Sequence, residues 1–152
     1  MKKAAALLIA VSCLAGCAAG TKTLVQTQKD VTIAVVPFED CEPSSVNNCK
    51  DSGALAAKIY GQVLGAPVLT SEADPAAKLY DLLVTGKVTH YNIGTPMVGR
   101  VNFAAVNVAV KRSADGVVVV TQEERNDASP TYGKKTHELV QEFAEDLKQV
   151  LR

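Results

Sequence analysis

Residues 81–124 constrain the fold most, because they hold three consecutive β-strand patterns separated only by short turns. Residues 81–91 and 100–112 alternate apolar side chains with polar or small ones, and residues 117–124 begin again with a run of valines. Asp115-Gly116 separates the last two stretches, and an Asp-Gly pair in that position is a strong hairpin signal. The segment therefore predicts a three-stranded antiparallel meander.

Alternation within these stretches predicts which side chains face the core, because successive residues of a strand point to opposite faces. Gly86 interrupts the first stretch and marks a bulge or a close approach of another segment. The expected core positions share even numbers: Leu82, Val84, Val88 and His90 in the first stretch, and Ala104, Val106, Val108 and Val110 in the second.

Further elements are predicted before the meander. Residues 31–38 form an almost continuous apolar run, which is typical of a strand covered on both faces. Asp51 or Ser52 can cap a helix that ends near Leu64, before Gly65. Its core stripe is expected to contain Leu55, Ile59 and Val63, with Ala56 and Tyr60 alongside.

A short strand is expected at residues 68–70, followed by a short helix. Two starts are available for that helix, and Asp74 as cap with Pro75 in the first helical position is the better one. Its expected core-facing residues are Ala76, Ala77, Leu79 and Tyr80. An amphipathic helix over residues 135–151 ends the chain, with an acidic solvated side.

This order of elements predicts an α/β fold of the two-layer α+β kind. A mixed sheet would contain the antiparallel meander, and the helices would pack on the sheet to bury their apolar stripes. The single folded domain would span residues 31–152. Residues 17–30 are polar and predict a flexible tether in front of it.

The first sixteen residues predict a signal peptide. A basic start, Met1-Lys2-Lys3, precedes an apolar run over residues 4–15. A membrane-spanning helix needs roughly 20 apolar residues, so this run is too short to be one. Leu14-Ala15-Gly16-Cys17 at its end resembles the lipobox of bacterial lipoproteins.

In that family the cysteine thiol receives a diacylglycerol group, the chain is cut just before the cysteine, and a fatty acid such as palmitate is added to the new amine. The resemblance therefore implies lipidation of Cys17. Ala18, where an Asp would favour the inner membrane, implies attachment to the periplasmic face of the outer membrane. Inner-membrane attachment is the alternative.

The four cysteines of the chain have different expected fates. Of four cysteines, Cys13 leaves with the signal peptide and Cys17 takes lipid, which leaves Cys41 and Cys49. Outside the inner membrane this close pair predicts a disulfide, with two free thiols as the alternative.

The 136 residues from Cys17 onward carry fourteen basic and sixteen acidic side chains and no basic patch. Nucleic acid is therefore not an expected partner.

The sequence carries no recognisable catalytic motif. A nucleophile elbow, a P-loop, a zinc-protease helix and a dinucleotide fingerprint are all missing. His90 is expected at the boundary of the core rather than as a base, and His137 at the surface. We therefore expect a protein that is not an enzyme, with no catalytic, cofactor-binding or metal-binding residues.

Three motifs, in order, resemble one superfamily of bacterial envelope lipoproteins. Residues 31–38 are similar to its "IAVLPF" strand, and residues 80–89 to its "DYLVTGTVT" strand. Residues 100–124 are similar to its "L-x-D-x-x-T-G-x-V" hairpin, although the Trp frequent in that hairpin is missing. The group includes the curli-secretion channel lipoprotein, the Pel-polysaccharide export lipoprotein and proteins with the N-terminal domain fold of the Tol–Pal translocation protein.

The resemblance implies an accessory component of an envelope export or assembly system, with protein partners and self-association into a ring. No loop is long enough to add a membrane hairpin, which needs two strands of ~9–11 residues. A lipid-tethered regulator of a cell-wall synthesis enzyme is the alternative. A periplasmic hydrolase or small-ligand binder is a third hypothesis, and a deep pocket around His90 would favour it.

Overall fold

The structure is a computed structural model that describes residues 31–44, 49–92, 102–125 and 135–152. The signal peptide, lipobox and tether predicted at residues 1–30 lie outside the described residues. The elements follow in this order: β1 (Ile33–Val35), α1 (Ser52–Leu64), the 3-10 helix η1 (Pro75–Leu79), β2 (Leu82–Asn92), β3 (Phe103–Arg112), β4 (Val118–Arg125) and α2 (Thr136–Val150).

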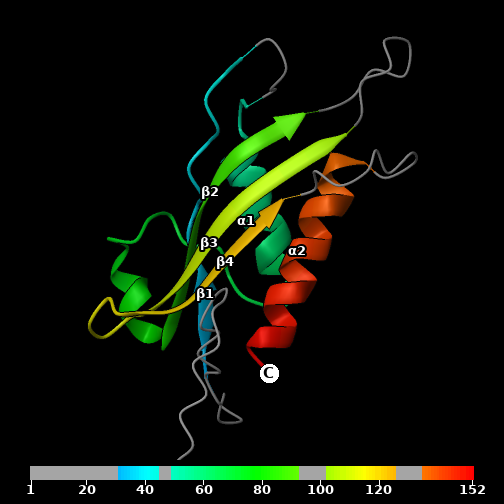
Figure 1. Cartoon of the computed structure of the whole chain (residues 1–152). Coiled ribbons are helices and arrows are strands. Elements are labelled where there is room, and N and C mark those ends of the chain that lie inside the picture. The colour runs from blue at the N-terminus through cyan, green and yellow to red at the C-terminus, as the bar shows by residue number, and fades with distance from the viewer. Residues whose placement is uncertain (1–30, 45–48, 93–101, 126–134) are drawn as a thin grey trace, which may run out of the picture.

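The four strands form one mixed sheet in the order β1-β2-β3-β4 (Figure 1). β1 pairs in parallel with β2, so that Ile33 lies opposite Leu82. β2, β3 and β4 pair antiparallel through their neighbours. The predicted meander and the α+β fold class are therefore confirmed.

Both helices cover one face of the sheet, behind the strands in Figure 1. The core between the two layers contains the even-numbered side chains of β3, as predicted, together with the apolar stripe of α2. On the other face, η1 and the segment after it cover only the β1 end, where Ala34, Val36, Ala77 and Leu83 form a smaller apolar cluster. No described helix covers the rest of that face, which we call the open face.

β1 is shorter than the predicted strand because Pro37 has no N–H to donate to a ladder. The chain nevertheless returns to β2 directly afterwards. Glu39 N–H donates to the Gly86 carbonyl at 2.9 Å, and Val88 N–H donates to the Glu39 carbonyl at 2.9 Å. The predicted strand at residues 68–70 is reduced to one parallel bridge, between Val35 and Val68. That bridge occupies the outer edge of β1.

A bulge in β2 overturns the predicted position of His90. The register with β3 shifts between Val88 and His90, which inserts one extra residue and exchanges the two faces beyond it. Tyr91 is consequently buried and His90 is exposed, the reverse of what strict alternation predicts. Burial raises the pKa of the Tyr91 hydroxyl. At Gly86 the reason for a glycine is close approach, since a Cβ there would lie 2.8 Å from the Phe38 ring.

The buried face of α1 also differs from the predicted one. Ala56, Ala57 and Tyr60 are fully buried, whereas Leu55 is 39% exposed. The start of α1 is pressed against the backbone before it, because a Cβ at Gly53 would lie 2.7 Å from the Phe38 carbonyl carbon. The helix can approach so closely only with the face that carries its smallest side chains. The row of Leu55, Ile59 and Val63 is therefore rotated away from the centre of the core.

The short helix begins as predicted, with the Asp74 carboxylate accepting from Ala76 N–H at 2.9 Å and Pro75 in the first position. It is a 3-10 helix, in which residues three apart align. Leu79 therefore shares the direction of Ala76 and not of the buried Ala77. The expectation that Leu79 faces the core is wrong: its side chain is 77% exposed.

Candidate functional site: a polar groove on the open face

The cysteine pair lies beside the start of α1 and away from the open face. Cys41 and Cys49 are joined by a disulfide with their Cα atoms 5.1 Å apart, and both are buried. Cys17, the expected lipidation site, lies outside the described residues. His137 is exposed, as predicted.

The start of α1 is capped from across this disulfide loop. Asp51 and Ser52 were the expected caps, but Asp51 has a left-handed backbone (φ 60°) and its side chain makes no capping bond. The Asp40 carboxylate supplies the cap, accepting from Gly53 N–H at 2.6 Å and from the Ser52 hydroxyl at 3.3 Å. The disulfide therefore serves the structure by holding the segment that caps α1.

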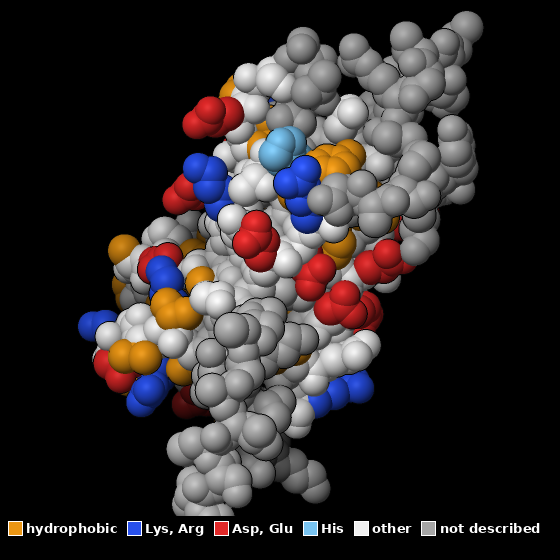
Figure 2. Space-filling view, viewed as in Figure 1, with side chains coloured by type: hydrophobic (Ala, Val, Ile, Leu, Met, Phe, Trp, Pro, Cys, Tyr) orange, Lys and Arg blue, Asp and Glu red, His pale blue; other side chains and the backbone are white. Residues whose placement is uncertain are grey.

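A groove of about 600 Å³ crosses the open face and is exposed to solvent (Figure 2). Its floor is the cross-strand row Thr85–Ala109–Thr121, which runs over β2, β3 and β4. These side chains are small, and the Thr85 hydroxyl is turned down to donate to the Ala109 carbonyl at 3.3 Å. Small floor residues between longer neighbours explain why the sheet is hollowed here.

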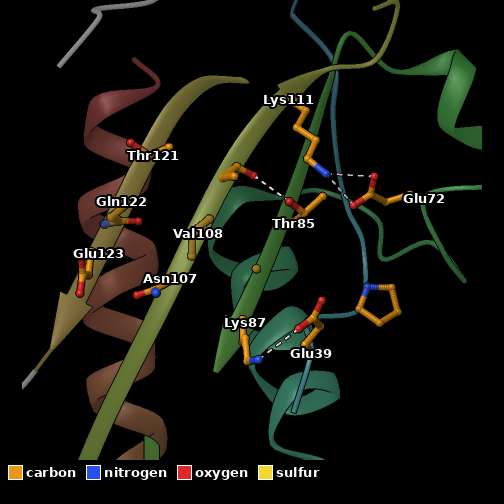
Figure 3. A pocket seen from close by; sticks show the side chains of 13 residues that line it. Glu39, Glu72, Thr85, Lys87, Asn107, Val108, Lys111, Thr121, Gln122 and Glu123 are labelled. Atoms are coloured by element: carbon orange, nitrogen blue, oxygen red, sulfur yellow. Dashed lines mark hydrogen bonds and ion pairs between the residues drawn. The ribbon is translucent and has the colours of Figure 1, made fainter. Parts of the chain in front are cut away.

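Charged side chains form the two walls of the groove (Figure 3). On one side lies the next cross-strand row, Lys87–Asn107–Glu123, in which Lys87 Nζ is 3.5 Å from Glu39. On the other side Lys111 Nζ contacts both carboxylate oxygens of Glu72, at 2.8 and 3.1 Å. Both pairs are partly exposed, so each contributes at most about 1 kcal/mol to stability.

Beyond the Lys87 wall, the bulge places a small aromatic cluster on the open face. The His90 ring meets the edge of Phe103 with centroids 5.5 Å apart, and the Arg125 guanidinium lies 5.9 Å from the centre of the Phe103 ring. The His90 side chain is exposed there and does not line the groove.

The two carboxylates with a shifted pKa, Asp74 and Asp81, lie outside the groove. The Asp74 carboxylate has a lowered pKa because the Thr70 hydroxyl and the backbone N–H groups of Ala76 and Thr70 donate to it. The Asp81 carboxylate has a lowered pKa because the backbone N–H and hydroxyl of Thr32 donate to it. The hydrogen bonds to Asp74 fix the start of η1, and those to Asp81 fix the point where the domain begins.

The arrangement offers the chemistry of a binding surface. Matched charges, hydroxyls and amides line a shallow groove and can form hydrogen bonds with a polar partner. No group of three or more His, Cys, Asp or Glu side chains with metal-site geometry occurs among the described residues. Within the same residues, no helix has both the length and the apolar content to cross a membrane.

Only an indirect signal for this groove is present in the sequence. Alternation in β2 assigns Thr85 and Lys87 to the non-core face, and the same rule assigns Asn107 and Lys111 in β3. Glu39 and Glu72 come from two loops outside the meander, and no spacing rule brings them to the sheet. Their positions follow from the return of Glu39 to β2 and from the packing of the η1 segment.

Comparisons with known proteins find similar structures but no similar sequences. No protein-family model matches the chain, and no curated protein matches its sequence. A PelC dodecamer from Paraburkholderia phytofirmans has a similar structure, with a TM-score of 0.57 at 15% identity over 79% of this chain and 86% of that one. A variant of the same protein in another crystal form gives a TM-score of 0.58 at 15% identity, over 79% and 88% of the two chains.

A hypothetical protein from Chlamydia trachomatis, CT253, is also similar, with a TM-score of 0.51 at 8% identity over 80% of this chain and 98% of that one. At such low identity the similarity concerns the fold and not the residues of the groove. The chain therefore shares its α+β fold, over most of its length, with PelC.

Proposed function

We propose that this protein is a lipid-anchored, non-catalytic accessory component of a bacterial envelope export or assembly system, and that it self-associates. The main support is the combination of a sequence ending at Cys17 that resembles a lipobox with a domain that shares the PelC fold. The anchor would sit in the outer membrane, with the domain in the periplasm. The groove of the open face is the surface that we assign to a protein partner.

Self-association is supported by the oligomers of the structural neighbour, since both PelC structures are dodecamers. Closed rings form when one surface of a subunit binds a different surface of the next and the rotation closes.

The test is the size of the full lipidated chain, extracted in mild detergent and measured by light scattering coupled to chromatography. A large homo-oligomer supports the export role. A stable monomer contradicts self-association and favours the alternative, a tethered regulator that binds an envelope enzyme. Mass spectrometry of the first peptide of the same preparation tests the anchor, because Cys17 should begin the chain and carry acyl groups.

A further inference from the structure

One end of the domain carries three exposed apolar side chains, Leu79, Val117 and Val118, and we call the surface around them the anchor-side patch. Leu79 is 77% exposed and each valine is 47% exposed. These are three of the five large apolar side chains that stay exposed in the described part of the chain. In Figure 2 hydrophobic side chains gather at the lower left, over η1 and the β3–β4 turn.

Hydrogen bonds hold the segments of this patch together. The Ser113 hydroxyl donates to the Ala77 carbonyl at 2.7 Å, which fixes the β3–β4 turn against η1. Ser113 N–H donates to the Asp81 carbonyl at 2.9 Å, and at the base of the turn Arg112 N–H donates to the Val117 carbonyl at 2.8 Å. Leu79 and the two valines therefore lie on neighbouring, hydrogen-bonded segments at one corner of the domain.

The folded domain begins at the same corner. Both the backbone N–H and the hydroxyl of Thr32 donate to the Asp81 carboxylate at 2.8 Å. Asp81 N–H returns a bond to the Thr32 carbonyl at 3.0 Å. Asp81 thus joins three segments: the start of the domain, the end of η1 and the β3–β4 turn. Any chain that arrives at Thr32 must enter beside the anchor-side patch.

The length of chain before this point is short. Fourteen residues, from Cys17 to Asp30, precede the domain. Fully extended they reach at most about 50 Å, and a flexible chain of this length averages roughly 20 Å from end to end. A lipid on Cys17 would therefore keep this corner, and not the opposite end of the sheet, close to the bilayer.

We propose that the anchor-side patch rests on the surface of the lipid bilayer, with Leu79 and Val117 inserted at the boundary between headgroups and acyl chains. The inference depends on the proposed lipid anchor and adds a second contact to it. Exposed apolar side chains bind such an interface in proportion to the area that they bury. The tether raises the effective concentration of the patch at the membrane, so even a weak contact is populated.

A lipid surface fits this patch better than a second copy of the chain does. A stable protein interface buries about 800 Å² on each partner, which three side chains cannot supply. Two of the basic side chains near the patch are paired with acidic ones, Arg112 with Asp115 and Lys111 with Glu72. The patch is therefore suited to a zwitterionic lipid surface. In this orientation β2 runs away from the bilayer, and the groove stays accessible to a partner in the periplasm.

The chain contains no Trp, so one introduced Trp reports its own surroundings without background. We suggest Leu79→Trp and, in a second protein, Val117→Trp in the full lipidated chain, reconstituted in phosphatidylcholine vesicles with and without brominated acyl chains. Leu55→Trp is the matched control, because Leu55 is also exposed but lies in the first turns of α1, beyond the far end of β1. Thermal melts establish that each variant is folded.

The proposal expects blue-shifted emission and strong quenching by brominated lipid for Leu79→Trp and Val117→Trp, with neither effect for Leu55→Trp. Emission at the patch that matches the control overturns it. A blue shift that brominated lipid does not quench, and that dilution removes, also overturns it and assigns the patch to a second copy. Mass spectrometry of the same preparation separates the two proposals: acylated Cys17 with unquenched emission from Leu79→Trp refutes only the patch, whereas unmodified Cys17 refutes the anchor.

Discussion

Tyr60 places a hydroxyl in the core without giving it a hydrogen bond. The residue is fully buried, its ring lies 5.1 Å from that of Phe38, and its hydroxyl finds no partner among the described residues. Burial, with smaller effects of the Glu124 and Asp146 carboxylates, raises the pKa of this hydroxyl far above its usual value. The side chain is therefore retained for its ring, and its oxygen opposes folding.

We predict that Tyr60→Phe raises the free energy of unfolding by about 1 kcal/mol, since an unpaired buried polar group is removed while the ring is kept. Tyr80→Phe, at a partly exposed position, is the control and should change little. Because the folded-state pKa of Tyr60 is raised, its effect on stability is constant below about pH 10 and falls as the pH rises further. Denaturant unfolding at pH 7 and above pH 10 measures both effects; equal alkaline losses in the parent and Tyr60→Phe would contradict the second.

Asp81 joins the start of the domain to β2 through a carboxylate whose pKa is lowered by the Thr32 backbone and hydroxyl. Because this pKa is lower in the folded state, the ionised Asp81 carboxylate stabilises the fold above the unfolded-state pKa of about 4. That stabilisation is lost as the pH falls through the folded-state pKa. We predict that Asp81→Asn lowers the melting temperature at pH 7 and has no effect near pH 2. Melting curves across this range test the prediction, and a difference that persists in acid would show that the charge is not the cause.

At the scale of elements, the start of α1 depends on a residue well before the helix in the sequence. The Asp40 carboxylate caps Gly53 N–H, while Asp51, in the nominal cap position, has an unfavourable left-handed backbone. We predict that Asp40→Ala costs about 1 kcal/mol, as loss of a helix cap does. Asp51→Gly, the matched control, should be neutral or stabilising because glycine accepts that backbone freely. Urea unfolding distinguishes them, and equal losses would refute the assignment of the cap.

The disulfide closes the loop between Asp40 and α1. We predict that reduction lowers the free energy of unfolding by about 2–3 kcal/mol, because closing a loop this short restricts the unfolded chain. Melting with and without reductant measures the loss. A double variant, Cys41→Ser with Cys49→Ser, should melt near the reduced parent and be insensitive to reductant; a parent that is equally insensitive would contradict the prediction.

β2 and the segment after β1 meet at Gly86, where an added Cβ would lie 2.8 Å from the Phe38 ring and 2.9 Å from the Asn107 carbonyl oxygen. We predict that Gly86→Ala costs about 1–3 kcal/mol through overpacking. Thr85→Ala, one residue earlier on the open face, removes a partly exposed hydrogen bond and should cost less. Chemical denaturation of both variants tests the order, and a neutral Gly86→Ala would show that the Phe38 ring can move aside.

At the scale of the whole molecule, the proposed lipid anchor would decide where the domain works. Two or more acyl chains bind a membrane stably, because each buried methylene contributes about 0.8 kcal/mol. We predict that Cys17→Ala releases the chain into the soluble envelope fraction, which fractionation and immunoblotting would detect. Ala18→Asp, which keeps the cysteine, should remain with membranes but move toward the inner one; continued sedimentation of Cys17→Ala would contradict lipid anchoring.

The sequence alone determined the order of the main helices and strands, the meander, the buried stripe of α2 and the α+β class, although the strand predicted at residues 68–70 is only a bridge. It did so because helices and strands impose periods of 3.6 and 2 on neighbouring residues, and such periods are written locally. Asp74 with Pro75 likewise marked the start of η1, since a cap acts within one turn. The sequence was sufficient to predict a feature wherever that feature depends on residues only a few positions apart.

Only the tertiary structure decided which face of α1 is buried, where β2 bulges and what caps α1. The bulge before His90 depends on pairing with β3, and the exposure of Leu55 depends on how closely Gly53 approaches Phe38. The groove has the same origin, because Glu39 and Glu72 reach the lysines of β2 and β3 from distant loops. Contacts between remote segments follow from packing the whole chain into one volume, and no short stretch of sequence contains that information.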